Sequence, residues 1–351
     1  PRRAAAGVRL PALLAAACQL RQGAAASFAS FPFEGNGAAG WAVDVGVAWS
    51  QGNSVTFKGN TRAYLVQNGN VGNWWGAKYV RFDLRGKTVS YTVNLGNVGC
   101  GVAACLYLVQ MGDPNGGPNY CDIQPNHGYA PCFELDMQES NSMAFHSSLH
   151  VQPGGAHNGV CDATYGCTAN LGRFPMTHDG VPTKDLYGPG GRINSKAPFQ
   201  VTAAFDHEGS MSVSLSQGGT VVPLFNRSNA GNVPPRFPRP NKPSGVPPDA
   251  IAKTAGAMGA GLVLVASLWQ GETHWLDHSA CGGQSWGNVG GASFTVSDFK
   301  VAATAAPAPA TTAAPKTPAP AVPASTDAPA PKAVATKAPK ATSTAAPKTP
   351  A

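Results

Sequence analysis

Charged side chains are scarce in this chain, and the scarcity is greatest away from its ends. Only 12% of the 351 residues are Asp, Glu, Lys or Arg. Residues 1–26 hold four arginines, and residues 302–351 hold five lysines against one aspartate, so each end contributes a charge of +4. Because the formal net charge of the chain is +7, the residues between the two ends have a net charge of −1. A nucleic-acid partner requires a basic face on the folded domain. The sequence therefore excludes that class of partner.

The cysteines lack the spacing of a metal site. Seven lie outside residues 1–26, with no CxxC pair and no histidines clustered beside them. This usage favours disulfides formed in an oxidising compartment. The segment "HSSLH", residues 146–150, places two histidines four apart but lacks the glutamate that zinc hydrolases of the HExxH type use as a base. We therefore expect no metal and no cofactor.

A convincing amphipathic helix pattern is also missing, whereas strand patterns recur. "KTVSYTVNL" alternates between apolar and polar residues, and "PFQVTAAFDHEGSMSVSLSQGGTVVPLF" alternates through two turns. The uncharged run at residues 254–271 is diluted by glycine, so its segment "LVLVASLW" indicates a buried central strand rather than a membrane helix. Together with 42 glycines and 31 prolines, these patterns predict an antiparallel β-sandwich.

The two ends differ in composition from the rest. Residues 1–26 combine arginines, an apolar run and small residues, which is the pattern of a secretory signal; Cys18 in "LAAAC" as a lipid-attachment site is the alternative. Residues 302–351 are rich in Ala, Pro, Thr and Lys, which predicts an extended, disordered linker. We expect one β domain over residues 27–301, and Asn226 in "NRS" as a glycosylation acceptor.

Against this low charge, "CFELDMQESN" holds three carboxylates, Glu134, Asp136 and Glu139. On a strand, Glu134 and Asp136 share a face while Glu139 has the wrong parity, and one extra residue in a β-bulge would restore it. Retaining glycosidases need two carboxyl groups about 5 to 5.5 Å apart, as nucleophile and as acid/base. An aspartate between them can hold the nucleophile and raise the pKa of the acid. A solvated strand face and a calcium site are the open alternatives.

Six motifs occur in one order between residues 58 and 301: "YCDIQ", "CFELDMQESN", "LYGPGG", "KAPFQVTAAF", "GLVLVASLW" and "HWLD". As a set they resemble the motifs of glycoside hydrolase family 7, the cellobiohydrolases and endoglucanases of cellulose breakdown. The resemblance implies a concanavalin-like β-sandwich, or jelly roll, with an open substrate cleft on its concave sheet. It casts Glu134 as nucleophile, Asp136 as its hydrogen-bonding helper and Glu139 as acid/base.

The resemblance also implies roles for other residues. It places His150 near the acid/base, and Tyr107, Asp122, Gln124, Arg173, Trp269 and Trp275 on the substrate. It pairs Cys100 with Cys281 and Cys121 with Cys132. Cys161 and Cys167 lack the partners that the family usually provides and are left to pair with each other, which leaves Cys105 without a disulfide partner. The tryptophan before the acid/base is replaced by Gln138.

The loops that would roof the substrate are shortened, which favours endo action over processive exo action. We therefore expect a secreted, monomeric retaining β-1,4-glucanase that acts on cellulose or a related β-glucan, without a membrane span. A non-catalytic carbohydrate-binding sandwich is the alternative from another class. A β-1,3- or mixed-linkage glucanase is the alternative within the enzymes.

Overall fold

The computed structural model describes residues 28–31, 39–67, 74–124, 128–151, 161–163, 166–172, 177–178, 180–228, 245–284 and 286–304. The chain divides into two compact units, residues 1–305 and 306–351, and all of the described residues belong to the first. About half of them lie in strands, nearly all of which pair antiparallel. The hydrogen-bonded order β11-β10-β9-β6-β19-β3-β20-β5-β16-β17-β18 runs through one sheet, which folds over between β3 and β20.

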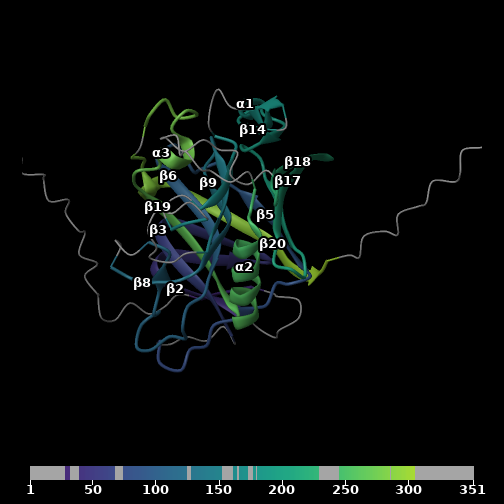
Figure 1. Ribbon diagram of the computed structural model, residues 1–351. Helices are drawn as coiled ribbons and strands as arrows, with labels where there is room; N and C mark the ends of the chain where they lie inside the picture. Colours follow the sequence, from purple (N-terminus) through teal and green to yellow (C-terminus); the bar gives the residue numbers. More distant parts are fainter. Residues whose placement is uncertain are drawn as a thin grey trace, which may run out of the picture. The chain divides into compact units, whose positions relative to one another are not determined.

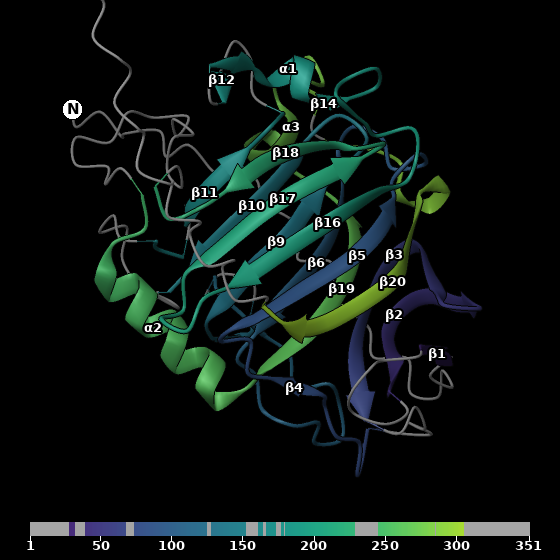
Figure 2. The same ribbon diagram turned by 90° about the vertical axis from the view of Figure 1, so that its right-hand side faces the viewer.

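The folded sheet forms two layers (Figure 2). One layer and its edge contain β1 (Phe28–Phe31), β2 (Ala39–Gln51), β3 (Ser54–Gln67), β4 (Arg81–Phe82), β6 (Val102–Val109), β9 (Glu134–Ser140), β10 (Phe145–His150), β11 (Cys167–Asn170) and β19 (Leu262–Gln270). The other contains β5 (Lys87–Asn94), β16 (Phe199–Phe205), β17 (Met211–Gln217), β18 (Thr220–Phe225) and β20 (Ser293–Ala303). β20 thus runs two residues past the predicted domain boundary at residue 301.

The remaining elements lie in the connections between these strands. They are β7 (Cys121–Asp122), β8 (Ala130–Pro131), β12 (Thr177–His178), β13 (Val181–Pro182), β14 (Tyr187–Gly188), β15 (Ile193–Asn194), α1 (Thr183–Leu186), α2 (Pro248–Ala260), α3 (His274–Asp277) and the 3-10 turn η2 (Val289–Gly291). Figures 1 and 2 show α2 and α3 outside the strands, at different ends of the sandwich.

The strands β6 and β19 are buried on both faces. In β6, Ala104, Leu106 and Leu108 pack in the core between the layers, while Cys105 and Tyr107 belong to a second apolar cluster on the opposite face. Alternation along a strand sends successive side chains to opposite faces, so both faces are covered only if both sets are apolar. This explains the unbroken apolar runs of these strands and confirms that "LVLVASLW" is a central strand. No helix among the described residues has the length and apolar character to cross a bilayer.

The predicted meander is confirmed as β16, β17 and β18, and "KTVSYTVNL" as β5. The expectation that no amphipathic helix is present is wrong, because residues 248–260 form α2. Proline begins this helix, and Gly261, with φ +89°, ends it. Ile251 and Met258 are buried, but the small residues between them hide the helical period. Gly209 allows the β16–β17 turn to touch the backbone of α2, where a Cβ would lie 2.7 Å from Ala255 N.

Candidate active site

A β-bulge in β9 turns all three carboxylates to one face of the sheet. Across β6, Tyr107 pairs with Asp136 and Leu106 with Gln138, so Met137 is the extra residue. The β9–β10 ladder shifts register at the same place. Leu135 and Met137 consequently pack in the core. Tyr107 pairs with Asp136 and Cys105 with Glu139, and both β6 residues face away from the core. Directly paired residues share a face of the sheet, so Asp136 and Glu139 point the same way and the predicted bulge is confirmed.

These carboxyl groups are poorly hydrated. Asp136 is 2% exposed, and its Oδ2 has no hydrogen-bond partner among the described residues. Burial, followed by repulsion between neighbouring carboxylates, raises the pKa of Glu134 and of Asp136 well above the ordinary range. Burial, then the charge of Asp122, raises the pKa of Glu139 to about 8. The cluster therefore retains protons at neutral pH.

His150 contacts the middle carboxylate of this group. Its Nδ1 lies 2.8 Å from the Asp162 carbonyl oxygen, so Nδ1–H donates to that carbonyl. Nε2 then faces Ser148 Oγ at 2.8 Å and Asp136 Oδ2 at 3.6 Å. Burial lowers the pKa of His150 to about 4 and keeps the ring neutral.

The histidine in contact with Glu139 is a different one, His146. Its Nδ1 lies 2.9 Å from Glu139 Oε2, and the two residues pair directly across β9 and β10. His146, which the sequence did not single out, thus makes the contact with Glu139, whereas the contact of His150 is with Asp136. The role of His150 in the site stays a prediction. The signal was present in "HSSLH", because histidines four apart on a strand share a face. The sequence does not reveal which of them meets Glu139.

The hydroxyl groups of Tyr107 and Tyr120 form a short chain that ends at Asp122. Tyr107, the cross-strand neighbour of Asp136, has its hydroxyl 3.0 Å from that of Tyr120, which donates to Asp122 Oδ2 at 3.4 Å. Asp122 Oδ1 accepts from the backbone N–H of Gln124 at 2.9 Å. The predicted residues Tyr107, Asp122 and Gln124 are thus brought together.

Sequence reasoning missed Arg62, which covers one end of this group. Its guanidinium carbon lies 4.1 Å from the centre of the Tyr120 ring, and its NH2 donates to Asp44 Oδ2 at 3.0 Å. It also donates to the Tyr129 hydroxyl at 3.3 Å. A cation stacked on an aromatic ring and paired with a carboxylate holds both partners in place. A lone arginine within an alternating strand carries no sequence signal for this role.

The two predicted sugar-stacking tryptophans lie together. Trp269, on β19, and Trp275, in α3, have ring centres 6.5 Å apart and planes inclined by 28°. Both remain partly exposed. The Trp275 ring also meets the His146 ring at 5.2 Å in an edge-to-face arrangement. Glu139, His146, Trp275 and Trp269 therefore form one continuous row of contacts.

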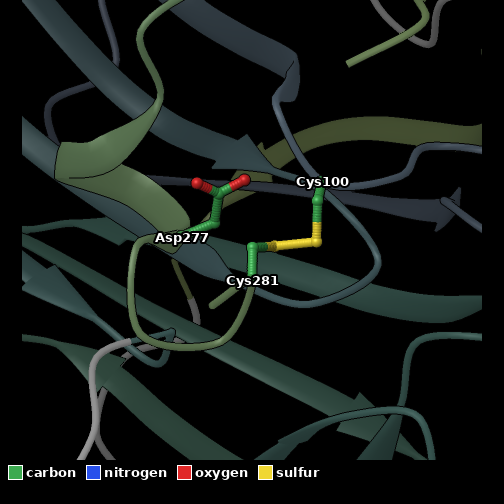
Figure 3. A group of neighbouring side chains, drawn as sticks. All are labelled: Cys100, Asp277 and Cys281. Carbon is green, nitrogen blue, oxygen red and sulfur yellow. A yellow bond between two sulfur atoms is a disulfide. The ribbon is translucent and has the colours of Figure 1, made fainter. Parts of the chain in front are cut away.

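Asp277 anchors the helix that carries Trp275 (Figure 3). Its buried carboxylate accepts hydrogen bonds from Gly101 N at 3.0 Å, from Asn141 Nδ2 at 2.7 Å and from Thr273 Oγ1 at 2.9 Å. The Cys100–Cys281 disulfide lies beside it. Because Asn141 follows β9 directly, this carboxylate ties α3 to the strand of the three acids.

The structure contains the three disulfides that the sequence suggested, Cys100–Cys281, Cys121–Cys132 and Cys161–Cys167. Cys105 is free and buried, directly across from Glu139 in the ladder. Burial raises the pKa of its thiol, and the neighbouring Glu139 and Asp136 carboxylates add to the rise.

Among the described residues, two groups of side chains have the composition of a cation site. Cys100, Asp277 and Cys281 form one, but its sulfurs are joined in a disulfide and cannot act as thiolate ligands. Glu134, Asp136 and His150 form the other, with donor atoms within 4.8 Å of one another.

Two further predicted residues remain, Arg173 and Asn226. Arg173 is outside the described residues. Asn226 follows β18 and is partly exposed, with its Oδ1 accepting from Ser228 N at 2.8 Å and Ser228 Oγ at 2.7 Å. Glycosylation at Asn226 stays a prediction.

Sequence relatives of the chain include two fungal proteins. Endoglucanase EG-1 of Hypocrea jecorina is 28% identical over 238 residues, which cover 58% of this chain and 48% of that protein. Endoglucanase 1 of Pyricularia oryzae is 27% identical over 257 residues, 59% of this chain and 58% of that protein. The chain thus spans about half the length of the curated relatives it matches. No family model matches it.

Solved structures share the fold. A structure of endoglucanase I complexed with cellobiose superposes with a TM-score of 0.52 at 22% identity, covering 72% of this chain and 77% of that one. The native endocellulase EGI of Humicola insolens gives 0.51 at 21% identity, covering 73% and 78%. These structures confirm the predicted β-sandwich, and the sequence relatives agree with the resemblance seen in the motifs.

Proposed function

We propose that this chain, a distant relative of the family 7 glycoside hydrolases, is a retaining β-1,4-glucanase that cleaves cellulose or a related β-glucan by double displacement. One observation carries the proposal: three carboxylates share one face of β9 because of the bulge at Met137, and the middle one, Asp136, is buried. Two partly exposed tryptophans are linked to Glu139 through His146. A lectin needs the tryptophans but has no use for an acid and a nucleophile.

In the first step, Glu139 protonates the glycosidic oxygen while Glu134 attacks the anomeric carbon. A pKa of about 8 keeps the proton on Glu139 at neutral pH, as a general acid requires. The C–O bond to the leaving sugar breaks, and a covalent glycosyl ester forms on Glu134. Water is then deprotonated by Glu139 and displaces Glu134, which returns the acid to its starting state.

Asp136 supports this sequence by holding a second proton, separate from the acid proton of Glu139. Burial favours the neutral form of Asp136, and its Oδ2 carries no other hydrogen bond among the described residues. A protonated Asp136 can donate to Glu134 and keep the nucleophile ionised. The proton on Asp136 thus leaves the Glu134 carboxylate free to attack.

The substrate-binding part of the proposal rests on Trp269 and Trp275. Sugar rings present C–H faces that pack on indole rings, while Tyr107, Asp122 and Gln124 offer polar groups for the hydroxyls. Endo action is favoured because the two relatives described above bear the name endoglucanase. We further propose that the protein is secreted, in agreement with its disulfides, and acts as a monomer.

The test is hydrolysis of cellopentaose and carboxymethylcellulose by the full chain and by Glu134→Gln, with the product anomer followed by NMR. A retaining enzyme forms the β-anomer first, and the substitution should lower kcat by at least ~10³-fold because it removes the nucleophile. Glu208→Gln, an exposed carboxyl in the β16–β17 turn, is the control. Loss of viscosity ahead of reducing-end release would support endo action.

Binding without cleavage by the unsubstituted chain would contradict the enzyme proposal and favour the carbohydrate-binding alternative. Cleavage of laminarin or mixed-linkage glucan in preference to cellopentaose would retain the mechanism and replace the substrate.

A further inference from the structure

We propose that His146 is a positioning residue that sets the direction and the strength of the acid Glu139, by donating its Nδ1–H to Glu139 Oε2. The inference rests on the proposed function for its consequence in catalysis. Its structural basis is the 2.9 Å contact between Nδ1 and Oε2, made by residues that pair directly across β9 and β10. Directly paired residues of neighbouring strands point to the same face, so the ladder itself brings the two side chains together.

The contact is held from three sides. The backbone pairing fixes both Cα positions, the edge-to-face contact with Trp275 fixes the plane of the imidazole, and little solvent reaches either group. The side chains of His146 and Glu139 are 8% and 16% exposed. Because water has limited access, a lost Nδ1–H donor would not be replaced at low cost.

The consequence for Glu139 is that one carboxyl oxygen is occupied. With Oε2 accepting from His146, the acid proton resides on Oε1, the oxygen left free to face a glycosidic oxygen. Once that proton has moved to the leaving group, Glu139 is an anion, and the same N–H···O bond becomes charge-assisted and stronger. An interaction that strengthens as the proton leaves stabilises the transition state more than the ground state.

The same bond moderates the pKa of Glu139. The titratable and charged groups that face this carboxyl come from several elements: Glu134 and Asp136 on β9, Cys105 on β6, Asp122 on β7 and His146 on β10. Burial and the carboxylate neighbours favour the protonated form of Glu139, whereas an N–H donor favours the ionised form. Loss of the donor should therefore move the ionisation of Glu139 to higher pH.

The experiment compares His146→Leu with His146→Asn in the full chain. The Asn side-chain nitrogen can take the place of Nδ1, so Asn keeps the donor, whereas Leu removes it. We expect the alkaline limb of kcat/KM for cellopentaose to rise by about one pH unit in the Leu variant and to stay in place in the Asn variant. His207→Leu, an exposed histidine in the other layer, is the matched control.

A substrate that needs little protonation separates this role from general structural damage. For dinitrophenyl β-cellobioside the leaving group departs unaided, so the loss of kcat/KM in His146→Leu should be at least tenfold smaller than for cellopentaose. Equal losses on both substrates, or an unmoved alkaline limb in the Leu variant, would overturn the proposal.

Titration of the Glu139 carboxyl carbon by ¹³C NMR tests the inference without any substrate, with Glu139→Gln to assign the signal. We expect the midpoint to rise by about one unit in His146→Leu and to hold in His146→Asn. If the chain cleaves no glucan, the proposed function is wrong, but this titration still decides the role of His146. An identical midpoint in wild type and His146→Leu would refute the proposed role of His146.

Discussion

Glu139 illustrates how a single residue depends on its surroundings. Its place in the sequence, three residues after Asp136, would put it on the opposite face of a regular strand. The bulge at Met137 reverses that outcome and places the carboxyl beside His146 and opposite Cys105. Burial then raises its pKa to about 8. Position, partner and proton affinity therefore all follow from one inserted residue.

The raised pKa of Glu139 predicts a pH-dependent gain in stability for Glu139→Gln. The folded-state pKa of about 8 exceeds the ordinary value of 4.5, so the folded protein binds this proton more tightly than the unfolded chain does. The stabilisation is complete below pH 4.5 and is lost as pH rises to 8. Glutamine has no such dependence, so the melting temperature of the variant should exceed that of the wild type by roughly 3 to 6 °C at pH 8.

Differential scanning calorimetry at pH 5, 6.5 and 8 measures this difference. The gain should grow with pH, and Glu208→Gln, an exposed carboxyl, should show no such trend. A difference that is constant with pH would mean that the folded protein does not raise the pKa of Glu139.

At the scale of elements, α3 is a four-residue helix that depends on its anchors. Its Trp275 takes part in the row of contacts that reaches Glu139. The hydrogen bonds of Asp277 and the Cys100–Cys281 disulfide hold it against the start of β6 and the end of β9. Without them, a helix this short would be unstable on its own.

Asp277→Asn should therefore loosen α3 and displace Trp275. The Asn side chain replaces one carboxylate oxygen, an acceptor, by an NH2 group, a donor. Since all three partners of Asp277 are donors, at least one of these buried hydrogen bonds is lost. We expect a loss of about 2 to 4 kcal/mol in the free energy of unfolding, measured by urea denaturation. The KM for cellopentaose should rise more than kcat falls.

Asp249→Asn provides the control, since this aspartate is exposed in the first turn of α2. It should cost only about 0.5 kcal/mol through the helix dipole. Equal stability of Asp277→Asn and wild type would show that the three hydrogen bonds do not hold α3 in place.

For the whole molecule, the compact unit that carries the site ends at Ala305. The last strand, β20, pairs with β5 as far as Ala303 opposite Lys87, and Thr304 N donates to the Gly86 carbonyl at 2.8 Å. A chain that ends at Ala305 keeps all of these contacts. We expect it to match the full chain within about 1 °C in melting temperature, and to match its kcat/KM on cellopentaose.

A second truncation, ending at Asp298, sharpens the comparison. It removes the pairs from Lys300 opposite Ser90 to Ala303 opposite Lys87, and the buried Phe299. This variant should lose several kcal/mol of stability, of which burial of Phe299 accounts for about 3. A lower melting temperature for the chain ending at Ala305 would show that residues 306–351 contribute to the stability of the domain.

The sequence alone determined the features that depend on local period and on motif. Alternating apolar residues predicted β5 and β16 to β18, an unbroken apolar run predicted β19, and the odd spacing of Glu139 predicted the bulge, because a buried sheet face specifies the parity of every residue on it. The helix α2 was missed because its small residues carry no clear period.

Only the tertiary structure decided which side chains meet across strands. The register of β10 on β9 puts His146, and not His150, beside Glu139, and the packing of β3 against the β7–β8 segment brings Arg62 onto Tyr120. Such contacts join residues whose proximity is set by non-local hydrogen bonds, so no local pattern encodes them. The identity of the three acids was therefore present in the sequence, while the partners that tune them came from the fold.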